Sequence, residues 1–148
     1  AAAFASFSLA MIVSRFSGDW ALEKFGPAKV VRVGGFGGAV LWGSAMAIAI
    51  PLSHSHPLPA FIIVNLGFIA AGLGIGPMFP AFMLAASKIP GIASGVALAR
   101  VGVIGIAGYF VGPTVTGVLA DTFSLPVAMT YPVSLLAMAG VLSKVIKD

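Results

Sequence analysis

Polar residues divide this 148-residue chain into five apolar stretches. They occupy residues 1–17, 30–50, 60–87, 92–119 and 126–146, with charged or turn-forming residues between them. A helix that crosses the roughly 30 Å hydrocarbon core of a bilayer needs about 20 apolar residues. The last four stretches reach that length, whereas residues 1–13 give only about 20 Å of helix. The pattern predicts an all-α polytopic transmembrane bundle of about five helices. We expect the first helix to be truncated and the chain to be a fragment of a longer protein.

Composition supports a membrane protein and excludes several other classes. The chain is 59% hydrophobic and 8% charged, against about 45–50% and about 25% in soluble domains. The formal charge of +4 comes from cations at helix ends, so no basic patch indicates a nucleic-acid partner. There is no cysteine, and His54 and His56 have no acidic neighbours in sequence. We therefore predict no metal site, no cofactor and no catalytic residue.

The third apolar stretch contains the sequence GLGIGPMFP at residues 72–80. Each proline removes a backbone donor and clashes with the preceding turn, which predicts a break or bend. Backbone freed at that depth must face protein or a water-filled cavity. Gly76, Pro77 and Pro80 are therefore candidates for a substrate path, together with Asn65 about two turns earlier. The alternative is a kink that only shapes helix packing.

Residues 14–32 carry the densest charge in the chain, and we expect them to form a loop where two helices meet water. The polar segments on this side of the predicted topology hold Arg15, Lys24, Lys29, Arg32, Lys88, Lys144 and Lys147, whereas residues 51–59 and 120–125 hold no Lys or Arg. Loops rich in these residues stay cytoplasmic. We therefore expect an integral protein of the bacterial inner membrane with a cytoplasmic C-terminus.

The same charged stretch resembles the cytoplasmic signature loop of the major facilitator superfamily. Gly18-Asp19 opens it, Glu23-Lys24-Phe25-Gly26 supplies the acid–base–x–Gly core, and Lys29 and Arg32 close it. Glu23 and Lys24 stand where the family has Asp and Arg. The fourth helix adds Gly108, Gly112, Pro113 and Gly117, which are similar to the family's glycine–proline helix motif.

The resemblance implies half of a two-domain transporter, here the helices eight to twelve of the C-terminal half. It implies that the missing other half of the same protein is a partner, beside the lipid bilayer and a small-molecule substrate. It also implies that the charged loop acts as a cytoplasmic gate, with Asp19 and Glu23 on one face and Arg15 four residues before Asp19. The alternative for this loop is an interfacial turn whose cations only set orientation.

Arg100 is the one cation far from the ends of its predicted helix, about eight residues or 12 Å from the cytoplasmic end. An intramembrane ionisable group is a candidate site, here for an anionic group of the substrate or a carboxylate elsewhere in the protein. The alternative is an arginine that extends to the interface as an anchor.

The sequence therefore predicts a fragment of a secondary-active transporter that works by alternating access. A non-transporting membrane scaffold is the alternative, because glycine-rich helices serve it equally well. A membrane-embedded enzyme is a third class, and it would need a convergent cluster of His, Asp, Glu, Ser or Cys. No Asp or Glu lies deep in a predicted helix, since Asp121 is near a helix end and Asp148 is terminal.

Overall fold

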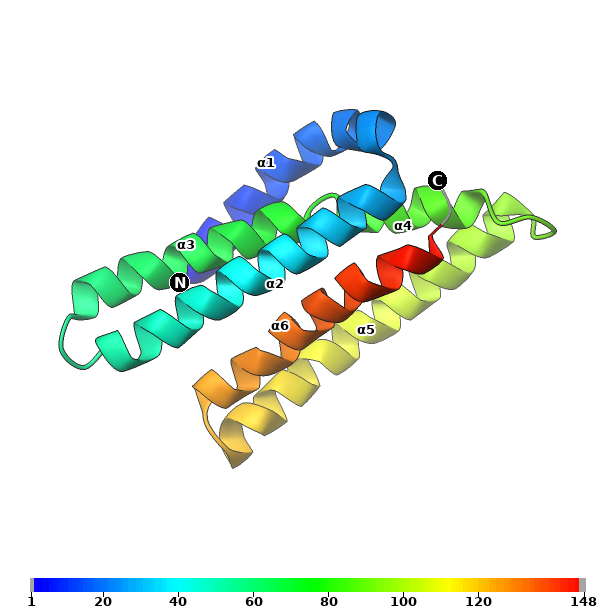
Figure 1. Ribbon diagram of the computed structural model, residues 1–148. Helices are drawn as coiled ribbons and strands as arrows, with labels where there is room; N and C mark the ends of the chain where they lie inside the picture. Colours follow the sequence, from blue (N-terminus) through cyan, green and yellow to red (C-terminus); the bar gives the residue numbers. More distant parts are fainter. Residues whose placement is uncertain (1, 147–148) are drawn as a thin grey trace.

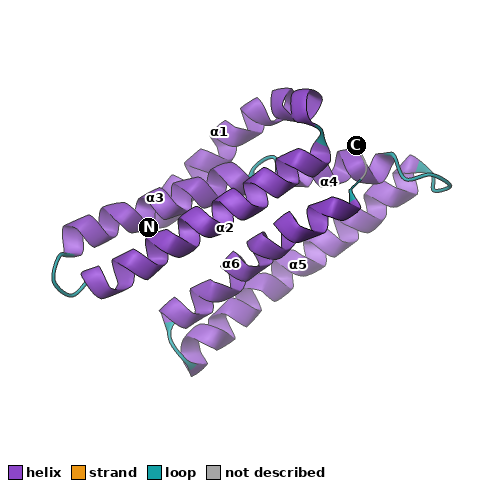
Figure 2. Cartoon of the chain, viewed as in Figure 1, coloured by secondary structure: helices purple, strands orange, loops and turns teal. Residues whose placement is uncertain are grey.

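The chain folds as a bundle of long helices. The computed structural model describes residues 2–146, so Ala1, Lys147 and Asp148 of the sequence predictions lie outside the described residues. Its elements are α1 (Ala2–Phe25), α2 (Pro27–Leu52), α3 (Pro57–Ile75), α4 (Met78–Ser87), α5 (Ser94–Thr122), α6 (Leu125–Leu142) and the 3₁₀ turn η1 (Ser143–Val145) (Figure 1). Helices and short loops account for all of residues 2–146 (Figure 2). The prediction of an all-α helical bundle is confirmed.

Within residues 2–146, four segments are long and apolar enough to cross a membrane: Pro27–Leu52, Pro57–Ser87, Ser94–Thr122 and Leu125–Val145. Across the bundle, α1 packs on α3, α3 on α2, α2 on α6, and α6 on α5 (Figure 1). The helix α4 continues the direction of α3 and contacts α2 and α5 at one end of the bundle. The helix α2 lies at the centre of this order and contributes the largest set of buried residues.

Glycines set how closely the central helices approach one another. A Cβ added at Gly34 of α2 would lie 2.5 Å from the carbonyl oxygen of Gly74 on α3, and the reverse addition gives the same distance. A Cβ added at Gly35 would lie 2.6 Å from the backbone nitrogen of Gly140 on α6. Small residues let backbones meet in this way within lipid, where packing rather than water exclusion holds helices together. The backbone of α2 is therefore in near contact with α3 on one side and α6 on the other.

The expectation of a loop over residues 14–32 is wrong. The helix α1 continues to Phe25 and α2 begins at Pro27, so the connection is the single residue Gly26. Charged residues do not interrupt a helix when their side chains reach solvent, and all six in this stretch are exposed. Gly26 has φ of 76°, a value that glycine adopts at little cost, and Pro27 occupies the first position of α2, where no N–H is needed.

The other helix bounds differ from the expected ones by smaller amounts. The first helix was expected to end at residue 17, the second to start at 30, and the third to run over 60–87. The third is instead divided into α3 and α4 by Gly76 and Pro77. Pro80 lies in the first turn of α4, where a missing N–H breaks no intrahelical bond, so Pro80 does not end a helix. The last two helices run over 94–122 and 125–142 rather than 92–119 and 126–146.

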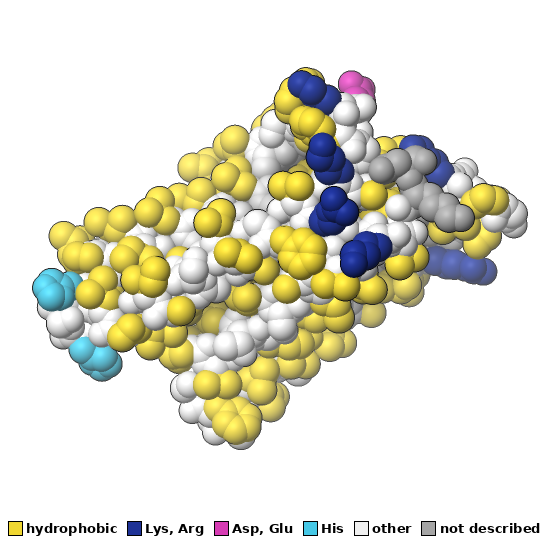
Figure 3. Space-filling model, viewed as in Figure 1, with side chains coloured by type: hydrophobic (Ala, Val, Ile, Leu, Met, Phe, Trp, Pro, Cys, Tyr) yellow, Lys and Arg dark blue, Asp and Glu magenta, His cyan; other side chains and the backbone are white. Residues whose placement is uncertain are grey.

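Charge is distributed unequally between the two ends of the bundle. Lys and Arg side chains gather at the end that holds the α1–α2 turn, whereas both histidines lie at the opposite end (Figure 3). We call the first the basic end; its described cations are Arg15, Lys24, Lys29, Arg32, Lys88, Arg100 and Lys144. The α4–α5 connection also lies there, and the loops before α3 and α6 lie at the other end (Figure 1). Successive connections therefore lie at alternate ends of the bundle, as expected of helices that cross a membrane one after another.

We expect Gly34→Ala to separate α2 from α3, because the new Cβ meets backbone that cannot move aside. Overpacking of this kind costs about 1–3 kcal/mol. Gly37→Ala on the same helix is the matched control, since a Cβ there meets nothing within 4 Å. Thermal unfolding of the purified full-length protein in detergent should show a lower Tm for Gly34→Ala alone. Equal Tm values for the two variants would contradict the close approach.

Candidate solute-path site at the helix break

The break between α3 and α4 lies inside a segment long enough to span the membrane. The backbone N–H of Gly76 still donates to the carbonyl of Gly72 at 3.0 Å, and the helical pattern resumes at Met78. Pro77 has no N–H, so it gives no hydrogen bond to the preceding turn. The candidate residues Gly76 and Pro77 therefore lie at the break, with Pro80 in the next turn.

The helix α1 supplies a side chain that supports this break. Ser14 Oγ lies 3.3 Å from the carbonyl oxygen of Gly72 and 3.0 Å from that of Met11, and its proton can be donated to either. Ser14 is buried, with 6% of its surface exposed. A Cβ added at Gly76 would overlap Ser14 Oγ, and one added at Gly18 would lie 3.2 Å from Pro77 Cβ. The break is consequently packed tightly against α1.

Asn65 joins the same two helices about three turns before the break. Its Oδ1 accepts a hydrogen bond from Ser6 Oγ at 3.0 Å, and its Nδ2 donates to the carbonyl of Phe61 at 2.8 Å. An amide has two N–H donors, and these bonds use one of them. Asn65 is half-buried and so remains open to a further partner.

An apolar cavity of about 540 Å³ lies beside the break. Its lining combines residues of five helices: Phe4, Phe7, Trp42, Phe68, Ile75, Met78, Pro132, Leu135, Leu136 and Ala139. Ligand pockets in proteins have volumes of about 300–1,000 Å³ and mostly apolar walls. The Trp42 ring stacks at a tilt on Phe68, with centroids 5.2 Å apart, and its buried Nε1 has no hydrogen-bond partner among the described residues.

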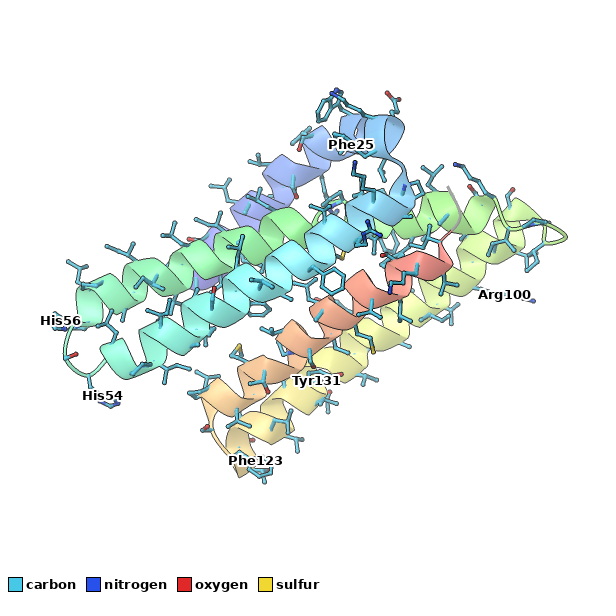
Figure 4. All side chains as sticks on the ribbon, viewed as in Figure 1. Phe25, His54, His56, Arg100, Phe123 and Tyr131 are labelled. Carbon is cyan, nitrogen blue, oxygen red and sulfur yellow. The ribbon has the colours of Figure 1, made fainter. Side chains whose placement is uncertain are left out.

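The structure does not bring Arg100 to this cavity. Arg100 lies on α5, six residues after Ser94 and therefore about 9 Å into the helix. Its side chain is exposed and points away from the other helices (Figure 4). The concavity beside it is formed by α5 residues alone.

The glycine–proline motif lies on the same helix as Arg100. A Cβ added at Gly108, Gly112 or Gly117 would meet nothing within 4 Å, and Pro113 is exposed. The helix α5 has one buried residue among those described, Ala97. The motif therefore packs against no other helix within residues 2–146, and its packing role stays a prediction.

The charged signature residues lie together around the α1–α2 turn. Lys24 Nζ lies 4.8 Å from the centre of the Trp20 ring and 5.6 Å from that of Phe25, and Lys29 Nζ lies 4.9 Å from the Phe25 ring. Asp19 and Glu23 are exposed and have no ion-pair partner among residues 2–146. Both carboxylates therefore face outward from the bundle.

The packing roles of Ser6 and Ser14 were not predicted from the apolar stretches, but the spacing of small residues in the sequence indicates them. Ser6, Ala10, Ser14 and Gly18 follow one another at intervals of four residues, which places them along one face of α1. This stripe of small residues faces α3 and the break. Trp42 had no comparable signal, because a single tryptophan in an apolar helix is ordinary in membrane proteins.

We expect Ser14→Ala to destabilise the protein by about 0.5–1.5 kcal/mol, the usual size of a hydrogen bond between membrane helices. Ser17→Ala is the control, since Ser17 is exposed and its hydroxyl bonds only to the carbonyl of Ser14 in its own helix. Unfolding of the full-length protein in mixed micelles would compare the two. A loss no larger than that of Ser17→Ala would show that the bond to Gly72 is absent.

Two known proteins similar to this chain are named as transporters, and a third is named as a membrane protein. An uncharacterized MFS-type transporter of Yersinia pestis is 32% identical over 125 residues, which is 84% of this chain and 30% of that protein. An uncharacterized transporter of Sinorhizobium fredii is 28% identical over 98% of this chain and 36% of its own length. The membrane protein MosC of Rhizobium meliloti is 27% identical over 86% of this chain and 29% of its own length. No family model and no solved structure matches.

The chain spans about a third of the length of these relatives. Four segments cross a membrane by length and composition, so the chain is an integral membrane protein. The similarity to the relatives named as transporters extends over most of its residues. An all-helical fold with four apolar spans agrees with the description of the relatives as membrane proteins. The chain is similar over most of its length to part of a transporter of the major facilitator superfamily, and its all-helical fold is consistent with a partial chain of such a protein.

Proposed function

We propose that the chain forms helices eight to twelve of a secondary-active transporter, which moves a small solute by alternating access. The observation that carries this proposal is the broken span α3–α4, which lies beside an apolar cavity and packs against α1. Interrupted membrane helices mark the solute sites of many transporters, because their freed backbone groups face a cavity. The names of the relatives support a transporter and point away from an enzyme.

The site residues have distinct roles in this proposal. Gly76, Pro77 and Pro80 shape the break, and Asn65 offers its remaining amide N–H to a polar group of the solute. Arg100 lies on the least buried helix, so the other half of the transporter covers it when the protein is complete. The guanidinium then faces the path and binds an anionic group of the solute.

The residues of the signature segment act at the cytoplasmic side. Asp19 and Glu23 lie four positions apart in α1 and so share a helix face. With no ion-pair partner within residues 2–146, they are available to cations of the other half-domain when the inward gate closes. In this proposal the basic end is cytoplasmic, as the distribution of Lys and Arg favours, and the protein lies in the bacterial inner membrane with its C-terminus inside.

Uptake by the full-length transporter tests the role of Arg100. Liposomes would be offered a panel of sugars, organic acids and drugs, and Arg100→Ala should lower uptake of an anionic solute at least tenfold. Arg100→Lys should retain part of the activity, since it keeps the charge. Lys88→Ala is the matched control, because Lys88 is exposed at the basic end but outside the membrane-spanning helices. Full uptake by Arg100→Ala would assign Arg100 to an anchoring role at the interface.

A further inference from the structure

A second cavity opens on the surface between α2 and α3, and Pro77 of the helix break is among its lining residues. Its volume is about 510 Å³, and we call it the glycine groove. It is lined by Ala21, Phe25, Lys29, Val30, Val33, Gly34, Gly37, Gly38, Leu41, Ala70, Leu73, Gly74 and Pro77. The groove stays open at Gly37, where a Cβ would meet nothing within 4 Å, while Gly34, Gly38 and Gly74 line it where the helices pack closely.

The groove has the length of one lipid chain within one leaflet. From Lys29 to Leu41 the helix α2 rises about 18 Å, slightly more than half of the roughly 30 Å hydrocarbon thickness. Lys29 marks the basic end and Leu41 the membrane interior. The groove therefore begins at the membrane surface and ends near the middle of the bilayer.

The groove walls are open to the surroundings of the bundle. Val33, Leu41 and Leu73 expose 63%, 57% and 45% of their surfaces. A Cβ added at Gly37 would meet nothing within 4 Å. An apolar surface of this kind, within a membrane-spanning segment, is suited to a hydrocarbon chain.

The mouth of the groove is basic and aromatic. Lys29 lines it, and Lys24 and Lys29 lie over the rings of Trp20 and Phe25, which themselves meet edge to face with centroids 5.8 Å apart. Neither lysine has a carboxylate partner among residues 2–146. Aromatic rings and lysines at the end of a spanning helix are typical of the headgroup level, and unpaired cations there attract anionic headgroups.

We propose that the glycine groove binds an anionic phospholipid. One acyl chain lies along Val33, Gly37 and Leu41, and the headgroup phosphate contacts Lys29, with Lys24 beside it. The combination of a chain-length apolar groove with a cationic mouth at its membrane-surface end carries this assignment. The proposal goes beyond the proposed transport function, and it does not depend on which solute is carried.

Native mass spectrometry of the full-length protein would test the proposal, with phosphatidylglycerol and phosphatidylcholine of identical chains as probes. We expect Lys29→Gln to lower phosphatidylglycerol binding about fivefold or more and to leave phosphatidylcholine binding unchanged. We expect Gly37→Leu, which fills the groove, to lower the binding of both lipids. The matched controls are Lys88→Gln, an exposed cation at the same end, and Gly108→Leu, an equally open glycine on α5.

Several outcomes would overturn the proposal. Unchanged phosphatidylglycerol binding in Gly37→Leu would mean that another helix of the polypeptide covers the groove. An equal loss in Lys88→Gln would mean that the lipid responds to the total charge of the basic end rather than to Lys29. Equal competition by soluble glycerol phosphate would mean that the cations bind free phosphate without the groove. The readout is lipid binding, so a failure of solute uptake leaves it unaffected.

Discussion

The near contact of backbones around α2 is the constraint on which the rest of the bundle depends. Within lipid, no water is released when apolar helices meet, so they associate through close packing and a few hydrogen bonds. Gly34 against Gly74, and Gly35 against Gly140, bring α3 and α6 onto opposite sides of α2. The positions of α1 on α3 and of α5 on α6 follow from those two contacts. A side chain at either crossing would therefore displace more than one helix.

The same packing makes an interrupted helix possible at membrane depth. Pro77 withdraws one donor from the span, and such a defect is tolerated only where protein surrounds it. The serine and glycine face of α1 closes on the break, and Ser14 offers its hydroxyl to a carbonyl of the last turn of α3. Stability and the candidate solute path thus share residues. A substitution that fills the break also removes the feature on which transport is proposed to depend.

The surface of the bundle is divided into regions with different surroundings. The helix α5 exposes most of its side chains, including that of Arg100, and the glycines of its motif are open. Another region, between α2 and α3, has a groove with a cationic mouth. Because the relatives are about three times as long as this chain, another part of the protein can cover the exposed side of α5. The groove between α2 and α3 has the length of a lipid chain in one leaflet.

The sequence by itself determined the fold class, the four spanning segments and the uneven charge of the two ends. These properties depend on apolar length and on which residues tolerate lipid, and both are local. The sequence also located the interruption near Gly76 and Pro77, because proline lacks a backbone N–H wherever it occurs. It misplaced the end of α1, since exposed charges continue a helix as readily as they begin a loop. Only the tertiary structure showed that Ser14 supports the break, that Arg100 faces outward, and that a groove remains open at Gly37 between α2 and α3. Each of these depends on the rotation of one helix against another, which is set by contacts between residues far apart in the chain.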